Sequence, residues 1–322
     1  MQPQVPVGHT RCYWTLLSTN LNFIYLDPVL ASHLGEQRDV LVGKPLLTFV
    51  HPDEVHNAKA DLGDMLHSKT LHGTVTRHVI HFIFHTSHFR RVRFCRLSRV
   101  RRLLGYDGPN PAWNDAEKVV LDENYMVVDI VTNYAADGIV LCFIHASVDL
   151  TPQDSDPIQK TDWTNWCGTP SLPPHEIQAL LSSLATYAHP SSSSMSRVFQ
   201  IFENSSSRSL LMSWPPDSPH DSLSSSRLAS MTASVDLGNA QNSPDAKTSC
   251  TRRYKYLQCL QGIDQQPQVE SIFIPHGESQ LWSFDLRGSA IVLMLIKNSF
   301  SISSPFRSTI IIIIAPCNTA VL

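Results

Sequence analysis

The sequence predicts an α+β fold, in which an antiparallel sheet with short helices is followed by a second β-rich region that disorder interrupts. Three observations carry this prediction. Short β-rich runs bounded by turn residues lie near both ends of residues 12–150. Between them, Gly43 and Pro45 break a stretch of short helical turns. Beyond residue 175, strand-like runs flank a segment rich in Ser, Asp, Pro and Asn.

The first strands are expected at residues 12–17 and 22–26, with Ser-Thr-Asn as the turn between them. Residues 36–42 can form one helical turn. Gly43 then suits the positive φ of a helix C-terminus, and Pro45 prevents the helix from continuing.

A second helix is expected to begin at Pro52, which suits the first helical position. Asp53 and Glu54 fall in its first turn, where the helix dipole favours carboxylates. Apolar residues then recur at helical spacing from Val55 to Leu66.

This order of parts, GEQRDVLVGKPLLTFVHPDE at residues 35–54 after a short strand, resembles the signature of PAS domains. The resemblance implies a PAS domain over residues 12–150. The wider layout is similar to PAS-containing regulatory proteins of basidiomycete fungi. PAS domains sense ligands in some proteins and only dimerise in others, so the fold alone does not assign a function.

The clearest hairpin lies at residues 125–133 and 139–148, around Asp137 and Gly138, because Asp-Gly between β-rich runs favours a tight turn. Both strands are largely apolar, which predicts that the helices cover one face and a partner covers the other. The residues expected in such an interface are Val128, Ile130, Val140 and Phe143.

The second region has two interpretations that the sequence supports equally: a degenerate PAS repeat, or unrelated β-ribbons flanking a linker. The tail contains an uncapped run of five isoleucines and resembles translated non-coding sequence. The expected divisions are a connector at 151–174, a helix and strands at 175–214, a disordered segment at 215–249, a β-meander at 250–286, and an aberrant or disordered tail at 287–322. The strands of the meander are expected at 252–260, 269–274 and 280–286.

Four histidines, His78, His81, His85 and His88, would share one face of a helix and could bind a metal there. Strand-favouring residues fill the gaps between them, and on a strand they would not converge, so no metal site is expected. The sequence up to residue 77 would continue naturally into the sequence from residue 92. Residues 78–91 are therefore expected to be an insertion.

An arginine-rich segment follows, with Arg90, Arg91, Arg93, Arg96, Arg99, Arg101 and Arg102. Such density can bind phosphates or act as a nuclear localisation patch. Apolar residues between the arginines favour the simpler interpretation, a solvated face opposite a buried one. No motif supports direct contact with nucleic acid.

No cofactor is expected. The residues around Cys95 do not match the sequence motif of a cysteine that forms a flavin adduct. His56, His67 and His72 could be haem ligands, but a surface or core position is favoured for each of them. No nucleophile elbow, P-loop, dinucleotide or zinc-protease motif occurs, so no catalytic residues are assigned.

Composition agrees with a non-enzymatic protein of the nucleus or cytoplasm. The 322 residues carry a net charge of -3, and their seven cysteines form no CxxC pair. No signal peptide or membrane span is expected. The sequence therefore predicts a regulatory protein that pairs with another PAS domain, as a homo- or heterodimer, and relies on a DNA-binding partner protein. A ligand or cofactor sensor is the alternative.

Overall fold

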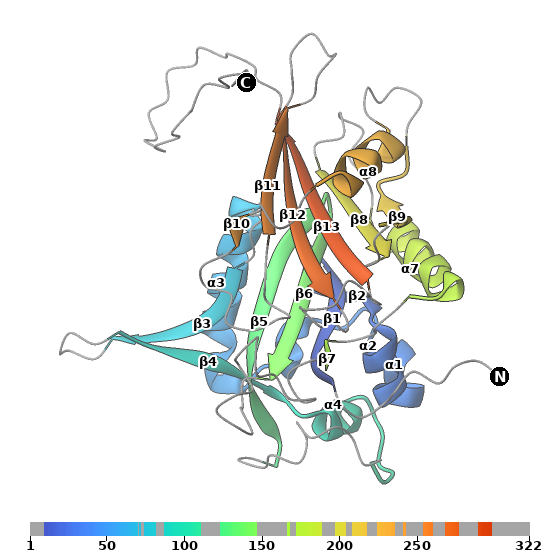
Figure 1. Ribbon diagram of the computed structural model, residues 1–322. Coiled ribbons are helices and arrows are strands. Elements are labelled where there is room, and N and C mark those ends of the chain that lie inside the picture. The colour runs from blue at the N-terminus through green and yellow to red at the C-terminus, as the bar shows by residue number, and fades with distance from the viewer. Residues whose placement is uncertain are drawn as a thin grey trace.

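Two antiparallel sheets and the helices that cover them make up the computed structural model (Figure 1), which confirms the predicted α+β class. It describes residues 10–69, 71, 74–81, 87–110, 123–146, 166–167, 172–188, 197–203, 208–217, 224–235, 241–242, 254–259, 268–276 and 289–297. We call residues 10–146 the first unit. The second unit is the second sheet with the helix at Ser225–Ala233, and it does not include the helix that precedes this sheet.

The first unit begins with two strands, continues through a helical stretch and closes with four strands. Its elements are β1 (Thr10–Ser18), β2 (Phe23–Leu26), α1 (Pro28–Leu34), η1 (Gly35–Gln37), α2 (Arg38–Leu41), η2 (Leu46–Phe49), η3 (Pro52–Glu54), α3 (Val55–Ser68), β3 (Thr74–His81), β4 (Ser87–Cys95), α4 (Leu97–Leu103), β5 (Tyr125–Ala136) and β6 (Ile139–Ala146).

Local sequence explains the helical stretch. Asp27 caps α1 because its carboxylate accepts the Val29 N–H at 2.9 Å, and Pro28 takes the first helical position. Gly43 has a φ of 87°, as expected for the glycine that ends the turn before Pro45. The helix expected at Pro52 starts as a single 3-10 turn and becomes α-helical at Val55.

The second unit follows a short strand and a helix. The elements after β6 are β7 (Trp166–Cys167), α7 (Pro174–Tyr187), β8 (Arg197–Glu203), β9 (Leu210–Trp214), α8 (Ser225–Ala233), β10 (Gln241–Asn242), β11 (Tyr254–Cys259), β12 (Gln268–His276) and β13 (Ser289–Lys297). The predicted strand at 280–286 lies outside the described residues, as do residues 298–322.

Two segments differ from the sequence prediction. Helix α8 and strand β10 lie within 215–249, which composition had suggested to be disordered. Strand β13 lies in the predicted tail, yet it occupies an interior position of the second sheet, between β12 and β8. A continuous apolar run such as AIVLMLI is typical of a strand covered on both faces, which explains the position of β13.

The two sheets share one strand order. The first runs β2-β1-β6-β5 and then β3 and β4, with β7 also beside β1. The second runs β10-β11-β12-β13-β8-β9. When β3 and β4 count as one strand and β10 is left aside, both sheets read 2-1-5-4-3 in chain order. Helices α1, α2 and α3 of the first unit and helix α8 of the second unit lie between the second and third of these strands.

Strands β3 and β4 together follow the path of one strand beside β5. Thr76 pairs with Ile130, and Val92 pairs with Val128, so a continuous strand would need one residue between them. The chain has fifteen there, residues 77–91, so the excess is fourteen. The described residues of this stretch, 77–81 and 87–91, form the part of the β3–β4 hairpin that projects away from the body in Figure 1. The register therefore supports the predicted insertion of residues 78–91.

Deleting residues 78–91 is expected to preserve the fold, because Arg77 would then lead into Val92 in the native register. The free energy of unfolding should change by no more than about 1 kcal/mol. Deleting one residue more, 77–91, is the matched control, because it shifts Val92 by one position and turns it away from the core. Urea unfolding should separate the two variants, and equal stabilities would contradict the single-strand register.

Candidate functional site

Three features of the described residues could carry function: the HPDE turn, the interior of the first unit and the contact between the two units. The helical turn at residues 51–54 binds directly to strand β4. Glu54 accepts hydrogen bonds from the backbone N–H of Arg93 at 2.6 Å and from its Nε at 2.7 Å. The His51 N–H donates to the Arg93 carbonyl at 2.9 Å, and the His51 ring lies 4.5 Å from the Tyr125 ring. The signature turn thus fastens the helices to the sheet.

Replacing Glu54 by alanine is expected to lower the free energy of unfolding by about 1–3 kcal/mol, because it leaves a partly buried N–H and guanidinium without their carboxylate. Asp53 is the matched control: its side chain is 75% exposed and lies 3.6 Å from Arg93. Its replacement by alanine should cost no more than about 0.5 kcal/mol. Chemical unfolding of both variants measures the difference, and equal losses would argue against the anchoring role.

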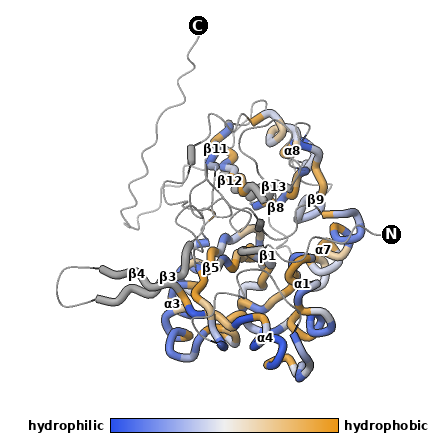
Figure 2. The backbone as a smooth tube through the Cα atoms, turned by 60° about the horizontal axis from the view of Figure 1, so that its bottom comes forward, coloured by the Kyte–Doolittle hydropathy of each residue, from blue (hydrophilic) through white to orange (hydrophobic). Residues whose placement is uncertain are grey.

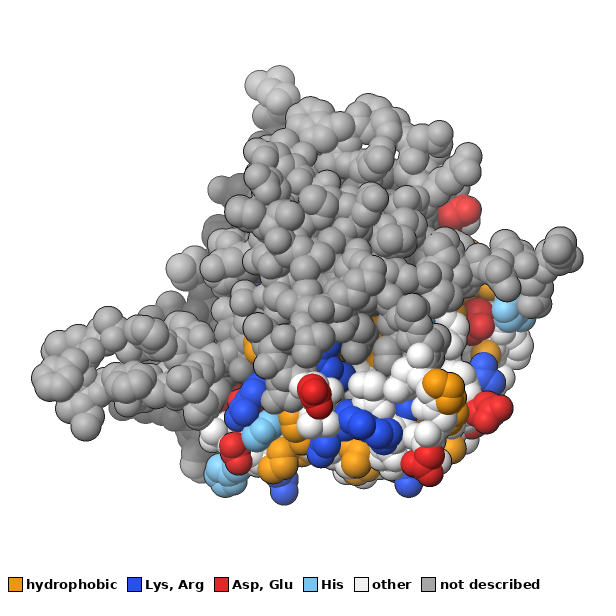
Figure 3. Space-filling view, turned by 90° about the horizontal axis from the view of Figure 1, so that it is seen from below, with side chains coloured by type: hydrophobic (Ala, Val, Ile, Leu, Met, Phe, Trp, Pro, Cys, Tyr) orange, Lys and Arg blue, Asp and Glu red, His pale blue; other side chains and the backbone are white. Residues whose placement is uncertain are grey.

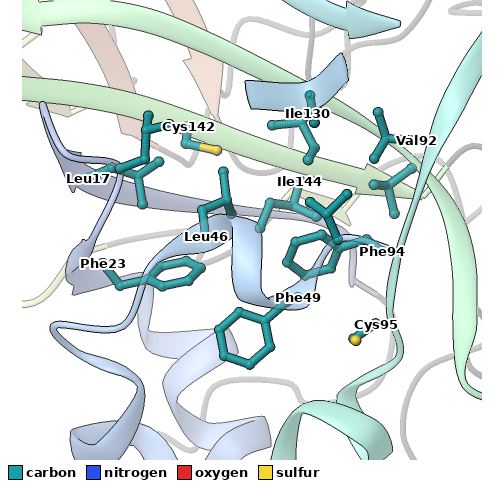
Figure 4. Packing of buried hydrophobic residues seen from close by; sticks show 14 of the residues in the cluster. Leu17, Phe23, Leu46, Phe49, Val92, Phe94, Cys95, Ile130, Cys142 and Ile144 are labelled. Carbon is teal, nitrogen blue, oxygen red and sulfur yellow. The ribbon is translucent and has the colours of Figure 1, made fainter. Parts of the chain in front are cut away.

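The interior of the first unit lies between its sheet and its helices, and apolar side chains occupy the part shown in Figure 4. Phe49 lies between Phe23 and Phe94, at centroid distances of 6.1 and 6.3 Å. Leu46, Ile130 and Cys142 are fully buried beside them. Figure 2 shows that the apolar interior is bordered by more polar segments, with hydrophilic colour along α3 and α4.

Neither described thiol of this interior is activated. Burial raises the pKa of Cys142. Burial also raises the pKa of Cys95, against the opposing effect of Arg99. Because the thiolate is the reactive form, these two cysteines are poor nucleophiles at neutral pH. His56 and His67 lie on the exposed side of α3, so the helix does not direct them at the interior; the side chain of His72 lies outside the description.

A buried histidine that the sequence analysis missed lies beside the helices. His33 is 2% exposed, and its Nδ1 is 2.7 Å from the Tyr13 hydroxyl. Burial lowers its pKa to about 4. No motif signals this residue, since it becomes buried only when α1 packs on β1.

Stability is expected to fall as the pH drops from 6.5 towards 4. The pKa of His33 is lower in the folded chain than in the unfolded one, so the unfolded state binds the proton more tightly in this window. The contribution of His33 is therefore complete above pH 6.5 and is lost on acidification, by up to about 3 kcal/mol. Urea unfolding of the wild type and His33→Gln at pH 7 and 5 measures it, and identical pH dependence would contradict the assignment.

The four predicted interface residues lie on opposite faces of the first sheet. Val128, Ile130 and Val140 belong to the interior, with exposures of 2%, 0% and 0%. Phe143 points to the other face, which we call the outer face. The strands are apolar on both sides, so the pattern alone could not assign the faces.

The outer face is covered by the same chain. Phe143 shares one buried cluster with Trp14 of β1, Leu184 of α7, Phe199 of β8 and Ile272 of β12. Figure 1 shows the second sheet next to the first, with α7 near β2 and β9. The second unit and α7 therefore occupy the position that the sequence analysis gave to a separate partner.

Polar contacts anchor this inter-unit interface. Arg197 donates to the carbonyl of Tyr134 at 3.0 Å and to the carbonyl of Lys69, which follows the end of α3. Its guanidinium lies 5.1 Å from the centre of the Tyr134 ring. Burial lowers the pKa of Arg197. At the other end, Tyr25 of β2 is buried, and burial together with Glu176 of α7 and Asp27 raises its pKa.

Four described arginines of the rich segment, Arg93, Arg99, Arg101 and Arg102, have partners within the first unit. Arg99 and Arg102 donate to the side-chain oxygen of Asn124, at 3.3 and 3.0 Å. Arg101 donates to Gln37 at 3.1 Å and stacks 3.6 Å from the centre of the Tyr106 ring. Figure 3 views the molecule from below and shows Lys and Arg side chains on this side, with hydrophobic and acidic side chains among them. These contacts favour the structural role over a phosphate site.

The histidine series falls on the β3–β4 hairpin and its loop. His78 and His81 lie on β3, and His88 lies on β4, where the backbone pairs Ile80 with His88. The side chains of residues 74–81 and 87–91 and the whole of His85 lie outside the description. Within the described part of the chain, no group of three or more His, Cys, Asp or Glu side chains is arranged to hold a metal. No described helix meets the length and hydropathy needed to cross a membrane.

These features define the chain as an α+β protein built on two antiparallel sheets that pack through an apolar interface. No family model matches the chain, and no curated protein matches its sequence. Among solved structures it is similar to the chromophore-binding domain of a phytochrome from Stigmatella aurantiaca, with a TM-score of 0.27. The two share 12% sequence identity, over 91% of this chain and 89% of that chain.

Proposed function

We propose that this chain is a non-enzymatic regulatory protein of the PAS type that acts through protein–protein contacts in signalling or transcriptional control. The burial of the outer sheet face against α7 and the second unit is the observation that carries the proposal. In PAS terms, the first unit is the PAS domain and the second unit is a degenerate repeat with the same strand order.

The regulatory contact proposed is the inter-unit interface. Arg197 binds both Lys69, which follows α3, and Tyr134, near the C-terminal end of β5. A shift of the helices over the interior would therefore alter its hydrogen bonds to the two carbonyls. The second unit would then respond to changes in the first. This gives the pairing predicted for two PAS domains a place within one chain.

Other partners follow from the same proposal. A regulatory protein without a DNA-binding motif needs a DNA-binding partner protein to act on genes. The chain would meet this partner in the nucleus or in the cytoplasm. A small-molecule or cofactor sensor is the alternative function, because PAS folds serve both roles. The resemblance to basidiomycete PAS proteins agrees with a regulatory role.

Native mass spectrometry and an absorption spectrum of the full-length protein test the proposal. The expected result is a 36.0 kDa polypeptide without a bound molecule and without absorption bands above the aromatic region. A bound small molecule, or a flavin or haem spectrum, would overturn it in favour of the sensor. Light scattering over a range of concentrations decides in addition whether a second copy binds; a constant monomer mass is expected if the second unit already fills the outer face.

A further inference from the structure

Helix α8 covers the face of the second sheet that is opposite the inter-unit interface. Val198 and Phe202 of β8 share a buried cluster with Leu228 of α8. The alternate β8 residues Phe199 and Ile201 belong to the inter-unit cluster instead. Side chains alternate between the two faces of a strand, so α8 and the first unit lie on opposite sides of this sheet. Figure 1 shows α8 beside β8 and β9.

The other side of α8 is exposed and carries serines with one arginine. Ser226 and Ser230 are one helical turn apart, and they are exposed together with Arg227. Ser230 is the only Ser or Thr in the sequence with an arginine three positions before it. Kinases select substrates by charge pattern, and a guanidinium at this position pairs strongly with carboxylates in a substrate groove. The residues around Ser230 therefore carry the charge pattern of a kinase target.

A kinase binds its target serine in an extended segment, so α8 has to open locally before Ser230 can react. Three properties of the helix favour this opening. It has nine residues, which is too short for a helix that is stable in isolation. Leu228 is the large apolar residue among those that α8 buries. Two hydroxyls also donate back to the helix, Ser230 to the Ser226 carbonyl at 3.0 Å and Thr232 to the Leu228 carbonyl at 2.9 Å, which weakens it slightly.

The C-terminal turn of α8 is held by Arg208, which lies just before β9. Its Nη1 donates to the carbonyls of Thr232, Ala233 and Val235. These carbonyls form the negative end of the helix dipole, and the guanidinium balances that charge. Ser230 lies in the same last turn of the helix. A phosphate on Ser230 would add about two negative charges there, repel the carbonyls and compete with them for Arg208.

We propose that Ser230 is the phosphorylation site of an arginine-directed serine kinase, and that its phosphorylation releases the C-terminal turn of α8 from the second sheet. The Ser230 Oγ attacks the γ-phosphorus of ATP, and the bond from that phosphorus to the bridging oxygen of ADP breaks. The hydroxyl proton passes to the catalytic aspartate of the kinase. The site belongs to the second unit alone, so it does not depend on the inter-unit contact proposed above.

Phosphopeptide mapping of the full-length protein tests the site. The protein is incubated with ATP, Mg²⁺ and a serine kinase that requires arginine three residues before its target, then digested and analysed by mass spectrometry. The expected result is one phosphate per chain, on Ser230. A chain that stays unmodified at Ser230 would overturn the proposal, as would phosphate spread over the other serines of α8.

Two exposed substitutions separate recognition from folding. Arg227→Gln should slow phosphate transfer to Ser230 about tenfold or more, because it removes a charge-assisted pair with the kinase. Ser226→Ala is the matched control on the same side of α8, and it should leave the rate unchanged. Equal rates in Arg227→Gln and the wild type, with both proteins folded by circular dichroism, would contradict recognition through Arg227.

Hydrogen exchange of the phosphorylated and unmodified proteins tests the release of α8. Amide protection in the segment from Ala229 to Val235 should fall about fivefold on phosphorylation, because the phosphate opposes the helix dipole. Protection of β5 and β6 in the first unit serves as the internal reference and should not change. Unchanged or increased protection of α8 would show that the phosphate does not release the helix.

Discussion

Replacing Val140 by aspartate is expected to unfold the first unit. Val140 is fully buried in the interior, and its strand lies between β1 and β5. The substitution removes apolar contacts and places a carboxylate where water cannot reach it, so the loss should be at least about 4–5 kcal/mol. Urea unfolding followed by far-UV circular dichroism measures this effect.

The matched control is Val40→Asp on α2, where the side chain is 45% exposed. It introduces the same change and should alter stability by no more than about 0.5 kcal/mol. The sequence prediction implied a different outcome for Val140→Asp, namely a folded protein that loses a partner. A folded variant with near-native stability and a smaller assembly would contradict the interior position of Val140.

Replacing Leu184 by aspartate is expected to detach α7 from the two sheets. Leu184 is fully buried in the inter-unit cluster, together with Leu180 of the same helix. Truncating a buried leucine costs about 2–5 kcal/mol, and a buried carboxylate adds to that cost. The apolar outer face would then be exposed, with Trp14 and Phe143 on it. The expected readouts are increased binding of a hydrophobic dye and separate unfolding transitions for the two units.

Ala185→Asp is the control for this experiment, because Ala185 is the next residue and lies on the exposed side of α7. It should bind no more dye than the wild type. If Leu184→Asp also behaved like the wild type, α7 would not contribute to the inter-unit interface. If it produced stable dimers, the exposed face would have found a second copy, which agrees with the pairing that the sequence predicted.

Local signals predicted the first unit well. Asp137 and Gly138 form the turn between β5 and β6, and Gly138 has the positive φ that such a turn requires. The HPDE turn lies where expected, although its contact with Arg93 joins positions thirty-nine residues apart and has no local signal. The inter-unit anchor Arg197 was missed for the same reason, since its partners Lys69 and Tyr134 belong to the other unit.

Composition misled in the second unit. The segment around α8 is rich in Ser, which suggested disorder, but Ser225, Leu228, Ala229 and Thr232 are buried at helical spacing. Ser224 also caps the helix by accepting the Arg227 N–H at 3.2 Å. Both signals are present in the sequence. Strand β13 was missed because a uniformly apolar run has no alternation to mark its strand faces.

The position of β13 has a consequence for biosynthesis. Strand β8 begins at Arg197 and pairs with β13, which ends at Lys297, so the second sheet joins its earliest strand to its latest. Pairings of such long sequence separation form slowly. While a ribosome is still making the chain, β8 and β12 must wait with open edges, and such edges invite association with other chains. The first unit, complete at Ala146, can fold meanwhile and offer its outer face as a template on which the later strands assemble.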